Sequence, residues 1–225
     1  MIDEISLRAA SYLRLGAGFI VGKLGPRPQQ PIILYEFEAC PFCRRVREAL
    51  SQLDLEAEIR PCPKQGTRFR PEAIDRAGKR SFPFMIDPNT GDEMFESADI
   101  IRHLYAHYGR SKPSPLLFGP LFATSHAASA VRARVGRARP SRRPEQLLHL
   151  WSFEASPFCR RVREVMCDLE LPYHLHNVAK LSPSRSDFIL RSGKMQVPYL
   201  EDPNTDTKMF ESRDIVAYLE RTYAA

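Results

Sequence analysis

Residues 32–48 read Ile-Ile-Leu-Tyr-Glu-Phe-Glu-Ala-Cys-Pro-Phe-Cys-Arg-Arg-Val-Arg-Glu, and this stretch decides the fold. Its first part, residues 32–37, is apolar, β-branched and aromatic, which predicts a buried strand. Residues 44–53 instead carry apolar side chains at helical spacing, which predicts an amphipathic helix. Cys40 therefore lies where a strand ends and a helix begins.

The N-terminal end of a helix favours an anion, because its free N–H groups and the helix dipole both point at it. This position predicts that the pKa of the Cys40 thiol falls from about 8.5 toward roughly 3.5–7.5. Pro41 suits the first helical turn, where its missing N–H costs nothing. Cys43 lies three residues further along the same face, so it can resolve a mixed disulfide formed at Cys40.

Composition limits the class of protein. Apolar residues make up 43% of the 225-residue chain and charged residues 27%, as in globular proteins. Five cysteines without a secretory signal indicate a reducing compartment, so we expect a cytoplasmic protein, or an organellar one whose transit segment has been removed. The apolar stretch 13–24 is too short to span a bilayer. The charge of +6 comes largely from an arginine-rich segment at 132–143, which we interpret as a solvated connector and not as a nucleic-acid site.

The remaining elements follow from periodicity and turn residues. A helix opens the chain and frays at Gly16, and strands are expected at 57–61, 82–87 and 93–95. A helix around 71–77 ends at Gly78, and Ser97 begins another that ends at Gly109.

The whole pattern then returns. Residues 34–48 match residues 150–164, an offset of 116, and the later phrases Asp-Pro-Asn-Thr and Met-Phe-Glu-Ser also recur. A repeat of this length is a duplicated domain and not a solenoid unit. We therefore predict four segments: an N-terminal helix and linker (1–30), a first domain (31–110), a linker with a helix (111–146) and a second domain (147–225).

The order strand, C-x-x-C, helix, strand, helix, strand beginning at a proline, strand, helix resembles the thioredoxin fold. Cys-Pro-Phe-Cys, Phe82-Pro83 and Glu96-Ser97 together resemble glutaredoxins and the N-terminal domain of glutathione S-transferases. The whole chain is similar to proteins that carry two such domains in tandem. The expected fold class is therefore α/β, with two glutaredoxin-like βαβαββα domains, each preceded by a lead-in helix (about 2–24 and 121–138).

The resemblance implies glutathione as ligand and assigns residues to it. Pro83 would be the cis-proline of the fold, and the backbone of Phe82 would pair with the cysteinyl part of glutathione. Glu96 and Ser97 would hold the γ-glutamyl end, where a helix N-terminus suits a carboxylate. A basic residue near the glycyl carboxylate would come from Lys64, Arg68 or Arg70. The matching residues of the second repeat are Val197, Pro198, Glu211 and Ser212.

The second repeat departs from the first at Ser156, which stands where Cys40 stands. A hydroxyl cannot attack a disulfide, so we expect dithiol chemistry in the first repeat alone. Ser156 either hydrogen-bonds and activates a glutathione thiolate, as in some glutathione transferases, or belongs to a decayed copy. Neither repeat has room for the larger helical domain of those transferases, which favours thiol exchange.

Other candidate residues are interpreted as structural. Cys62, Cys159 and Cys167 are expected to serve as small apolar or surface residues, and Trp151 as part of the core. His103 and His107 share a helix face at a spacing that can bind zinc, but the sequence shows no third ligand. We assign them to a solvated face and predict no metal site.

Three functions remain open. The leading one is a glutaredoxin-like thiol–disulfide oxidoreductase acting on glutathionylated or disulfide substrates, with Cys40 as nucleophile and Cys43 as resolving residue. The second is a glutathione transferase that uses Ser156 or Cys40 to activate the thiol. The third is a non-catalytic module that binds glutathione or an iron–sulfur cluster. In each case we expect a monomer whose halves pack as a pseudo-dimer.

Overall fold

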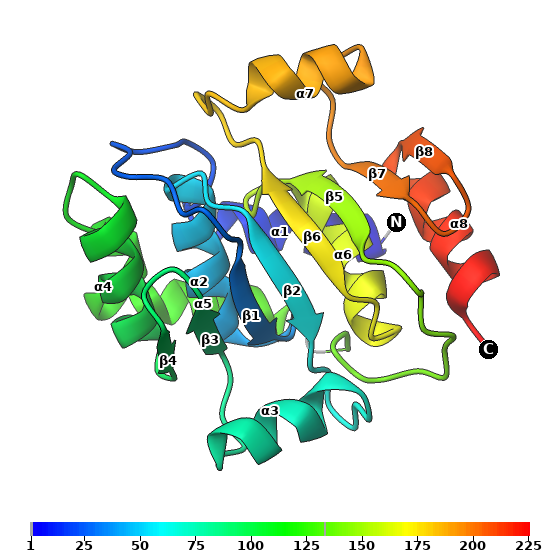
Figure 1. Cartoon of the computed structure of the whole chain (residues 1–225), viewed down its shortest axis with the longest axis horizontal. Coiled ribbons are helices and arrows are strands. Elements are labelled where there is room, and N and C mark those ends of the chain that lie inside the picture. The colour runs from blue at the N-terminus through cyan, green and yellow to red at the C-terminus, as the bar shows by residue number, and fades with distance from the viewer. Residues whose placement is uncertain (1, 133) are drawn as a thin grey trace.

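The computed structural model describes residues 2–132 and 134–225. The strands of this part of the chain form one continuous eight-stranded sheet. The strand order is β4-β3-β1-β2-β6-β5-β7-β8, and Figure 1 shows the sheet crossing the molecule diagonally. Each repeat contributes one half of the sheet, so the order is a palindrome of corresponding strands.

The first repeat has the predicted order of elements. They are β1 (Ile32–Glu36), α2 (Pro41–Gln52), β2 (Ala57–Pro61), α3 (Phe69–Ala77), β3 (Phe84–Asp87), β4 (Asp92–Met94) and α4 (Ser97–Tyr108). Strand β1 pairs parallel with β2 and antiparallel with β3, which in turn pairs antiparallel with β4. This is the thioredoxin-like topology that the motif order predicted.

The second repeat reproduces this topology. Its elements are β5 (Leu148–Ser152), α6 (Pro157–Asp168), β6 (Tyr173–Asn177), α7 (Arg185–Ser192), β7 (Tyr199–Asp202), β8 (Thr207–Phe210) and α8 (Ser212–Tyr223). Strand β5 pairs parallel with β6 and antiparallel with β7. The tandem thioredoxin-like architecture expected from the repeat is confirmed.

The two halves join where β2 pairs antiparallel with β6. Ala57 lies opposite Leu175 and Ile59 opposite Tyr173. Each of these strands forms the edge of its own half, and an edge strand exposes unpaired N–H and C=O groups. Pairing the two edges satisfies these groups and makes one sheet from two.

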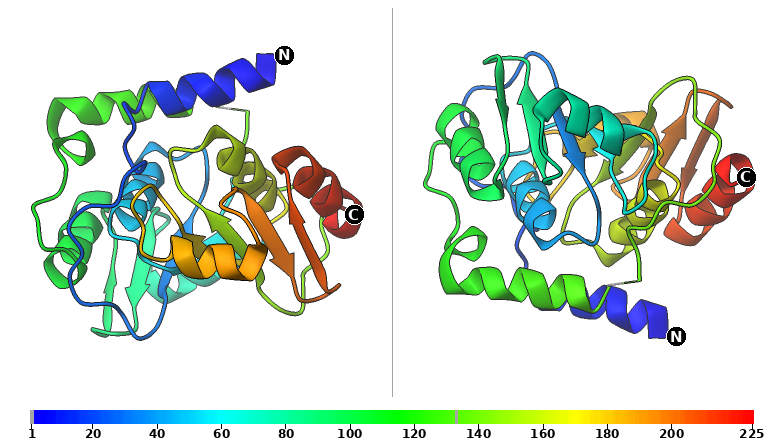
Figure 2. Two further views of the ribbon diagram at one scale, coloured as in Figure 1. Left: turned by 90° about the horizontal axis from the view of Figure 1, so that it is seen from above. Right: turned by 90° about the horizontal axis from the view of Figure 1, so that it is seen from below.

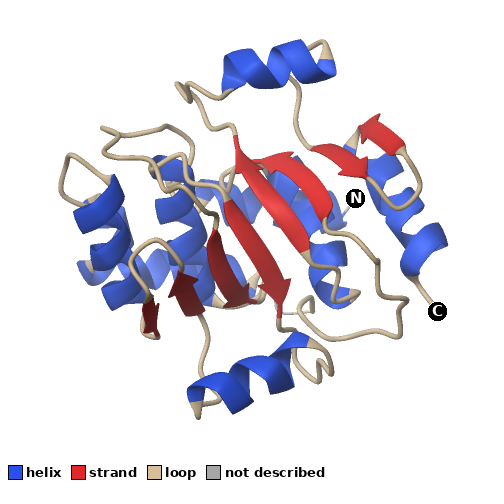
Figure 3. Cartoon of the chain, viewed as in Figure 1, coloured by secondary structure: helices blue, strands red, loops and turns tan. Residues whose placement is uncertain are grey.

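Figure 3 shows most helices behind the sheet, with α7 at the top of the view and α3 at the bottom. Helices α2, α4, α6 and α8 share one apolar core that spans both repeats, in which Val46 and Val162 are fully buried. On the other face, α3 covers a small cluster around Tyr35 and α7 covers one around Trp151. The middle of that face, over β2 and β6, has no helix in front of it (Figure 1).

The lead-in helices are shorter than expected. Helix α1 (Ile2–Tyr12) ends before the left-handed turns at Leu15 and Gly16, and α5 (Ala123–Ala130) follows two short 3₁₀ turns, Pro115–Leu117 and Gly119–Phe122. The predicted second lead-in includes Ala133, which lies outside the described residues, as Met1 does for the N-terminal segment. Every described helix is too short or too polar to cross a bilayer.

The lead-in helices are also exchanged between the repeats. Helix α1 precedes the first repeat but packs against α6 of the second, while α5 precedes the second repeat and packs against α2 of the first. The two helices contact each other, and Figure 2 shows them running in line along one side of the molecule.

Candidate functional site

Cys40 caps the N-terminus of α2. Its backbone is extended (φ −79°, ψ 121°), Pro41 occupies the first helical position, and the Cys43 N–H donates to the Cys40 Sγ at 3.2 Å. A side chain that accepts a backbone N–H at this position does the work of a Ser or Asp cap. The sulfur thus lies at the positive end of the helix, as the sequence predicted.

The loop at Pro83 faces this cysteine. The Phe82–Pro83 peptide bond is cis, as predicted, and the Cys40 thiol lies 3.8 Å from the Phe82 carbonyl oxygen. The Phe37 and Phe82 rings meet edge to face, with their centroids 6.3 Å apart. The structure therefore brings together the cysteine and the backbone segment that the resemblance assigned to the cysteinyl part of the ligand.

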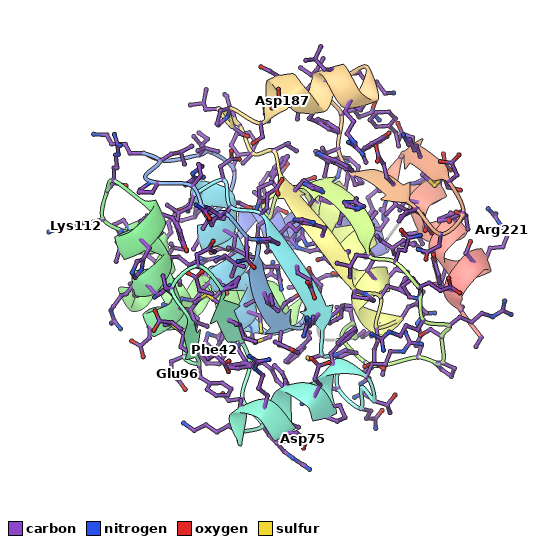
Figure 4. The ribbon with its side chains drawn as sticks, viewed as in Figure 1. Phe42, Asp75, Glu96, Lys112, Asp187 and Arg221 are labelled. Carbon is purple, nitrogen blue, oxygen red and sulfur yellow. The ribbon has the colours of Figure 1, made fainter. Side chains whose placement is uncertain are left out.

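The third predicted element is the start of α4. Glu96 has a positive φ of 62° and an exposed side chain at the rim of the molecule, beside the end of β4 (Figure 4). Ser97 is buried, and its Oγ accepts a hydrogen bond from Arg45 Nη1 at 3.2 Å. Because Arg45 belongs to the cysteine-bearing helix, this bond ties the start of α4 to α2. The sequence analysis did not identify Arg45 as a site residue.

The two cysteines of the motif are electrostatically unequal. Burial acts to raise the pKa of Cys40, but hydrogen bonds from the Cys43 thiol and from the Cys43 and Phe42 N–H groups outweigh it, so the pKa is lowered. Burial raises the pKa of Cys43 well above that of an ordinary thiol. Cys40 keeps 4% of its surface exposed and Cys43 none. Of the two thiols, Cys40 thus ionises more readily and is the one with exposed surface.

The second repeat copies this geometry with a hydroxyl in place of the thiol. Ser156 caps α6, and its Oγ accepts the Cys159 N–H at 3.2 Å. The Val197–Pro198 bond is cis, and Arg161 Nη1 donates to the Ser212 Oγ at 3.2 Å, as Arg45 does to Ser97.

Glu211, like Glu96, has a positive φ, here 67°. Its carboxylate accepts a hydrogen bond from Gln196 Nε2, so it is held against the segment that precedes the cis-proline. The predicted ligand residues of both repeats therefore occupy equivalent places.

The basic residues after β2 have different surroundings. Arg68 turns to the second repeat, where it donates to the carbonyl oxygens of Leu169 and Glu170 at 3.3 and 3.2 Å. Arg70 stacks over the Phe82 ring, with 4.6 Å between its guanidinium carbon and the ring centroid. Arg70 therefore lies beside the predicted groove, where it could meet the glycyl carboxylate of glutathione. Arg68 instead forms part of the contact between the two repeats.

A cavity of about 520 Å³ lies beside Ser156. Its lining is mainly apolar and combines α1 and the turn after it with the start of α6: Arg8, Ser11, Tyr12, Leu15, Gly16, Phe19, Ala155, Pro157 and Phe158. At the equivalent place in the first repeat, the Phe42 ring packs against Phe122 and His126 at centroid distances of 5.3 and 5.5 Å. The space next to the helix start is thus open in the second repeat and occupied by aromatic side chains in the first.

Buried charges connect the two sites, a feature that the sequence analysis missed. Glu154, in the loop before Ser156, accepts hydrogen bonds from Arg47 at 2.9 Å and from Arg163 at 2.6 Å, and all three side chains are almost fully buried. Arg163 also donates to Glu38, in the loop before Cys40, at 2.7 Å. Each cysteine or serine loop is thus held by arginines from both repeats.

Arg132 and His103 were both expected to be solvated, and both predictions are wrong. Arg132 is buried and pairs with Glu164 on α6, so the arginine-rich segment is not wholly a solvated connector. The side chain of His103 is 7% exposed and lies 2.8 Å from Asp87, whereas His107 is exposed as expected. Periodicity alone could not identify these acidic partners, because they come from distant elements.

The remaining residues assigned to structural roles are buried, as those roles require. Trp151 belongs to the apolar cluster beneath α7, and Cys62, Cys159 and Cys167 are buried. Burial raises the pKa of each of these three thiols, which makes them poor nucleophiles at neutral pH.

A family model described as "Glutathione S-transferase, N-terminal domain" matches residues 34–113 and again residues 150–225. Among solved structures, a Bombyx mori glutathione transferase is 29% identical with a TM-score of 0.34, and the match covers 38% of this chain and 39% of that chain. A trimeric Leishmania glutathione transferase is 14% identical with a TM-score of 0.33, over 87% of this chain and 68% of that chain. This chain therefore spans about two fifths of the length of the Bombyx mori protein. A comparison with curated proteins gave no match.

Proposed function

Because the chain belongs to the family of the glutathione S-transferase N-terminal domain, we propose that it binds glutathione and acts as a thiol–disulfide oxidoreductase. The observation that carries the proposal is Cys40, a helix-capping thiol of lowered pKa facing the Phe82–Pro83 loop. Glutathione would bind with its cysteinyl backbone along Phe82 and its γ-glutamyl carboxylate at Ser97, where the Arg45 guanidinium adds a positive charge.

The reaction is a thiol exchange. The Cys40 thiolate attacks the glutathione sulfur of a mixed disulfide, the S–S bond breaks, and the substrate sulfur leaves as a thiolate that takes a proton from water. A second glutathione thiolate then attacks the Cys40–glutathione disulfide and releases oxidised glutathione. When the substrate protein is itself bound to Cys40, Cys43 attacks Cys40 and frees the protein thiol. The Cys40–Cys43 disulfide that remains is reduced by two molecules of glutathione.

The test is release of glutathione from a glutathionylated peptide by the full chain. Cys40→Ser should abolish turnover, whereas Cys43→Ser should retain activity on this small substrate, because a second glutathione can replace the resolving thiol. A matched control is Cys62→Ser, a buried cysteine outside the motif, which should turn over normally. Unchanged turnover in Cys40→Ser would overturn the proposal.

The matching cap in the second repeat allows the thiol to be moved from one repeat to the other. The double variant Cys40→Ser, Ser156→Cys moves the thiol to the α6 cap, where the backbone N–H of Cys159 is already in place. If the second repeat also binds glutathione, activity should return in this variant. Continued inactivity in a folded double variant would show that the second groove does not bind the ligand.

One observation favours a second function, conjugation of glutathione to an apolar electrophile at Ser156. The Ser156 Oγ accepts a backbone N–H, so its hydroxyl hydrogen can be donated to a glutathione thiolate. The residues on either side of it, Ala155 and Pro157, line the cavity of about 520 Å³. Conjugation of 1-chloro-2,4-dinitrobenzene should then survive Cys40→Ser and be lost in Ser156→Ala. Leu15→Trp, which fills the cavity, should raise KM for the electrophile. The opposite pattern, loss in Cys40→Ser alone, would assign both reactions to the first repeat.

A further inference from the structure

Three histidines meet on the face of the sheet that no helix covers at its centre. His149 on β5 lies opposite His174 on β6 in the parallel register, and His176 follows two residues later on β6. Residues two apart in a strand, and residues directly opposite each other, project from the same face. All three imidazoles are partly exposed, and Figure 1 shows β5 and β6 facing the viewer between α3 and α7.

The imidazole nitrogens are close enough to share one ion. One ligand-capable nitrogen from each histidine lies within 4.8 Å of the others, and His149 Nδ1 is 3.0 Å from His176 Nε2. Nitrogens bound tetrahedrally to zinc at about 2.0–2.1 Å lie roughly 3.3 Å apart. His174 Nε2 is buried, and Glu56 Oε2, 3.4 Å away, does not reach it with the geometry of a hydrogen bond.

A carboxylate from the other repeat supports the cluster. Glu56, immediately before β2, places its Oε1 2.7 Å from His176 Nδ1 and its Oε2 3.4 Å from His174 Nε2. Histidines that bind metals usually donate their second N–H to a carboxylate, which orients the ring. His176 has this arrangement, with Nδ1 toward Glu56 and Nε2 toward His149.

We propose that His149, His174 and His176 form a binding site for a late first-row divalent metal ion such as Zn²⁺, with Glu56 as the orienting carboxylate. Imidazole nitrogen is a favoured ligand of Zn²⁺, Co²⁺, Ni²⁺ and Cu²⁺. The three rings are stacked within 15–25° of one another, so binding requires them to turn about χ2, a soft torsion. The exposed face leaves a fourth position for water.

The proposed site lies across the seam between the repeats. Its three imidazoles belong to the second repeat, and Glu56 belongs to the first, one residue before the strand that pairs with β6. A bound ion would therefore add a link to the β2–β6 pairing. An ion that binds only the folded chain stabilises it by mass action, so Zn²⁺ should raise the Tm of the protein.

The test is titration of the full-length, metal-free protein with Co²⁺, followed by visible absorption and by displacement with Zn²⁺. We expect one ion per chain with tetrahedral d–d bands. His149→Gln and His174→Gln should each weaken binding at least about tenfold, and Glu56→Gln should weaken it about 10–100-fold. His107→Gln, an exposed histidine outside the cluster, should bind as the unchanged protein does.

Three results would overturn the proposal. One is equal affinity in the His149→Gln, His174→Gln double variant, and another is no binding at millimolar metal. The third is intense sulfur-to-cobalt charge-transfer absorption, which would place the ion on the cysteines. Zn²⁺ should also raise the Tm of Cys40→Ser but not that of His149→Gln, so this site is tested independently of the thiol chemistry.

Discussion

The helix cap differs by a single atom between the two sites: the sulfur of Cys40 is replaced by the oxygen of Ser156, while the cap geometry is unchanged. Both accept the backbone N–H three residues later at 3.2 Å. The same backbone therefore presents a thiol in one repeat and a hydroxyl in the other. At this scale, chemistry depends on side-chain identity and not on the fold.

The lowered pKa of Cys40 predicts the pH dependence of its alkylation. A thiol of lowered pKa is deprotonated at lower pH than an ordinary thiol, so the pH at which the rate with iodoacetamide begins to rise should be shifted downward for Cys40. Peptide mapping should place the fast label on Cys40, and Cys40→Ser should remove it. A rate that begins to rise only above pH 8.5, as for an ordinary thiol, would contradict the capping argument.

At the scale of elements, α2 and α6 bury charge as well as apolar surface. Their sequence Arg-Arg-Val-Arg-Glu indicates a solvated polar face, yet Arg44, Arg47, Arg160 and Arg163 are fully buried. The two helices come from different repeats, and the acidic loops between β1 and α2 and between β5 and α6 supply the counter-charges. Removing one partner of a buried ion pair strongly destabilises the fold, because the remaining charge stays buried without a counter-charge.

Glu154 is the carboxylate around which four of the buried arginines gather. Burial acts to raise its pKa, but Arg163, Arg47, Arg160 and Arg44 outweigh burial and hold the pKa well below its ordinary value. Glu154→Gln should therefore lower the free energy of unfolding by about 3–5 kcal/mol in urea denaturation. The control is Glu93→Gln, which breaks an exposed pair with Arg76 and should cost about 0–1 kcal/mol.

The lowered pKa of Glu154 also determines how its contribution to stability changes with pH. A carboxylate whose pKa is lowered by folding adds stability above its unfolded value, here 4.5, and loses it as the pH falls below that value. The difference in stability between the unchanged protein and Glu154→Gln should thus stay level from pH 7 to about pH 5 and shrink as the pH falls below 4.5 toward the lowered pKa of the folded state. A difference that grows over this range would contradict the assigned charge state.

At the scale of the whole molecule, the two repeats depend on each other. Each half taken alone leaves β2 or β6 as an open edge, and α1 and α5 each cover a helix of the opposite repeat. Arg68 and Glu38 likewise have their partners across the seam. From these contacts we expect the halves to fold as one unit, although each carries a full thioredoxin-like set of elements.

This interdependence predicts the behaviour of a divided chain. Residues 1–113 and 114–225 expressed separately should each show little cooperative unfolding by circular dichroism, because each lacks its exchanged helix and the counter-charges of its buried arginines. Mixing or coexpressing the two pieces should restore a cooperative transition and a one-to-one complex. Cooperative unfolding of either piece alone would show that the seam is not required for folding.

The local elements were determined by the sequence itself. The strand–cysteine–helix junction at residues 32–48 and its recurrence at 150–164 were predictable, because periodicity, caps and turns depend on neighbouring residues. The cis bonds before Pro83 and Pro198 were expected only from the resemblance to the thioredoxin fold. The tertiary structure alone decided the β2–β6 seam, the exchange of α1 and α5, the burial of Arg47 and Arg163, and the meeting of three histidines. These features bring together residues of different elements, and several of them, such as Ala57 opposite Leu175 and Arg47 beside Glu154, join residues more than 100 positions apart. No local pattern in the sequence predicts which side chains will meet in this way.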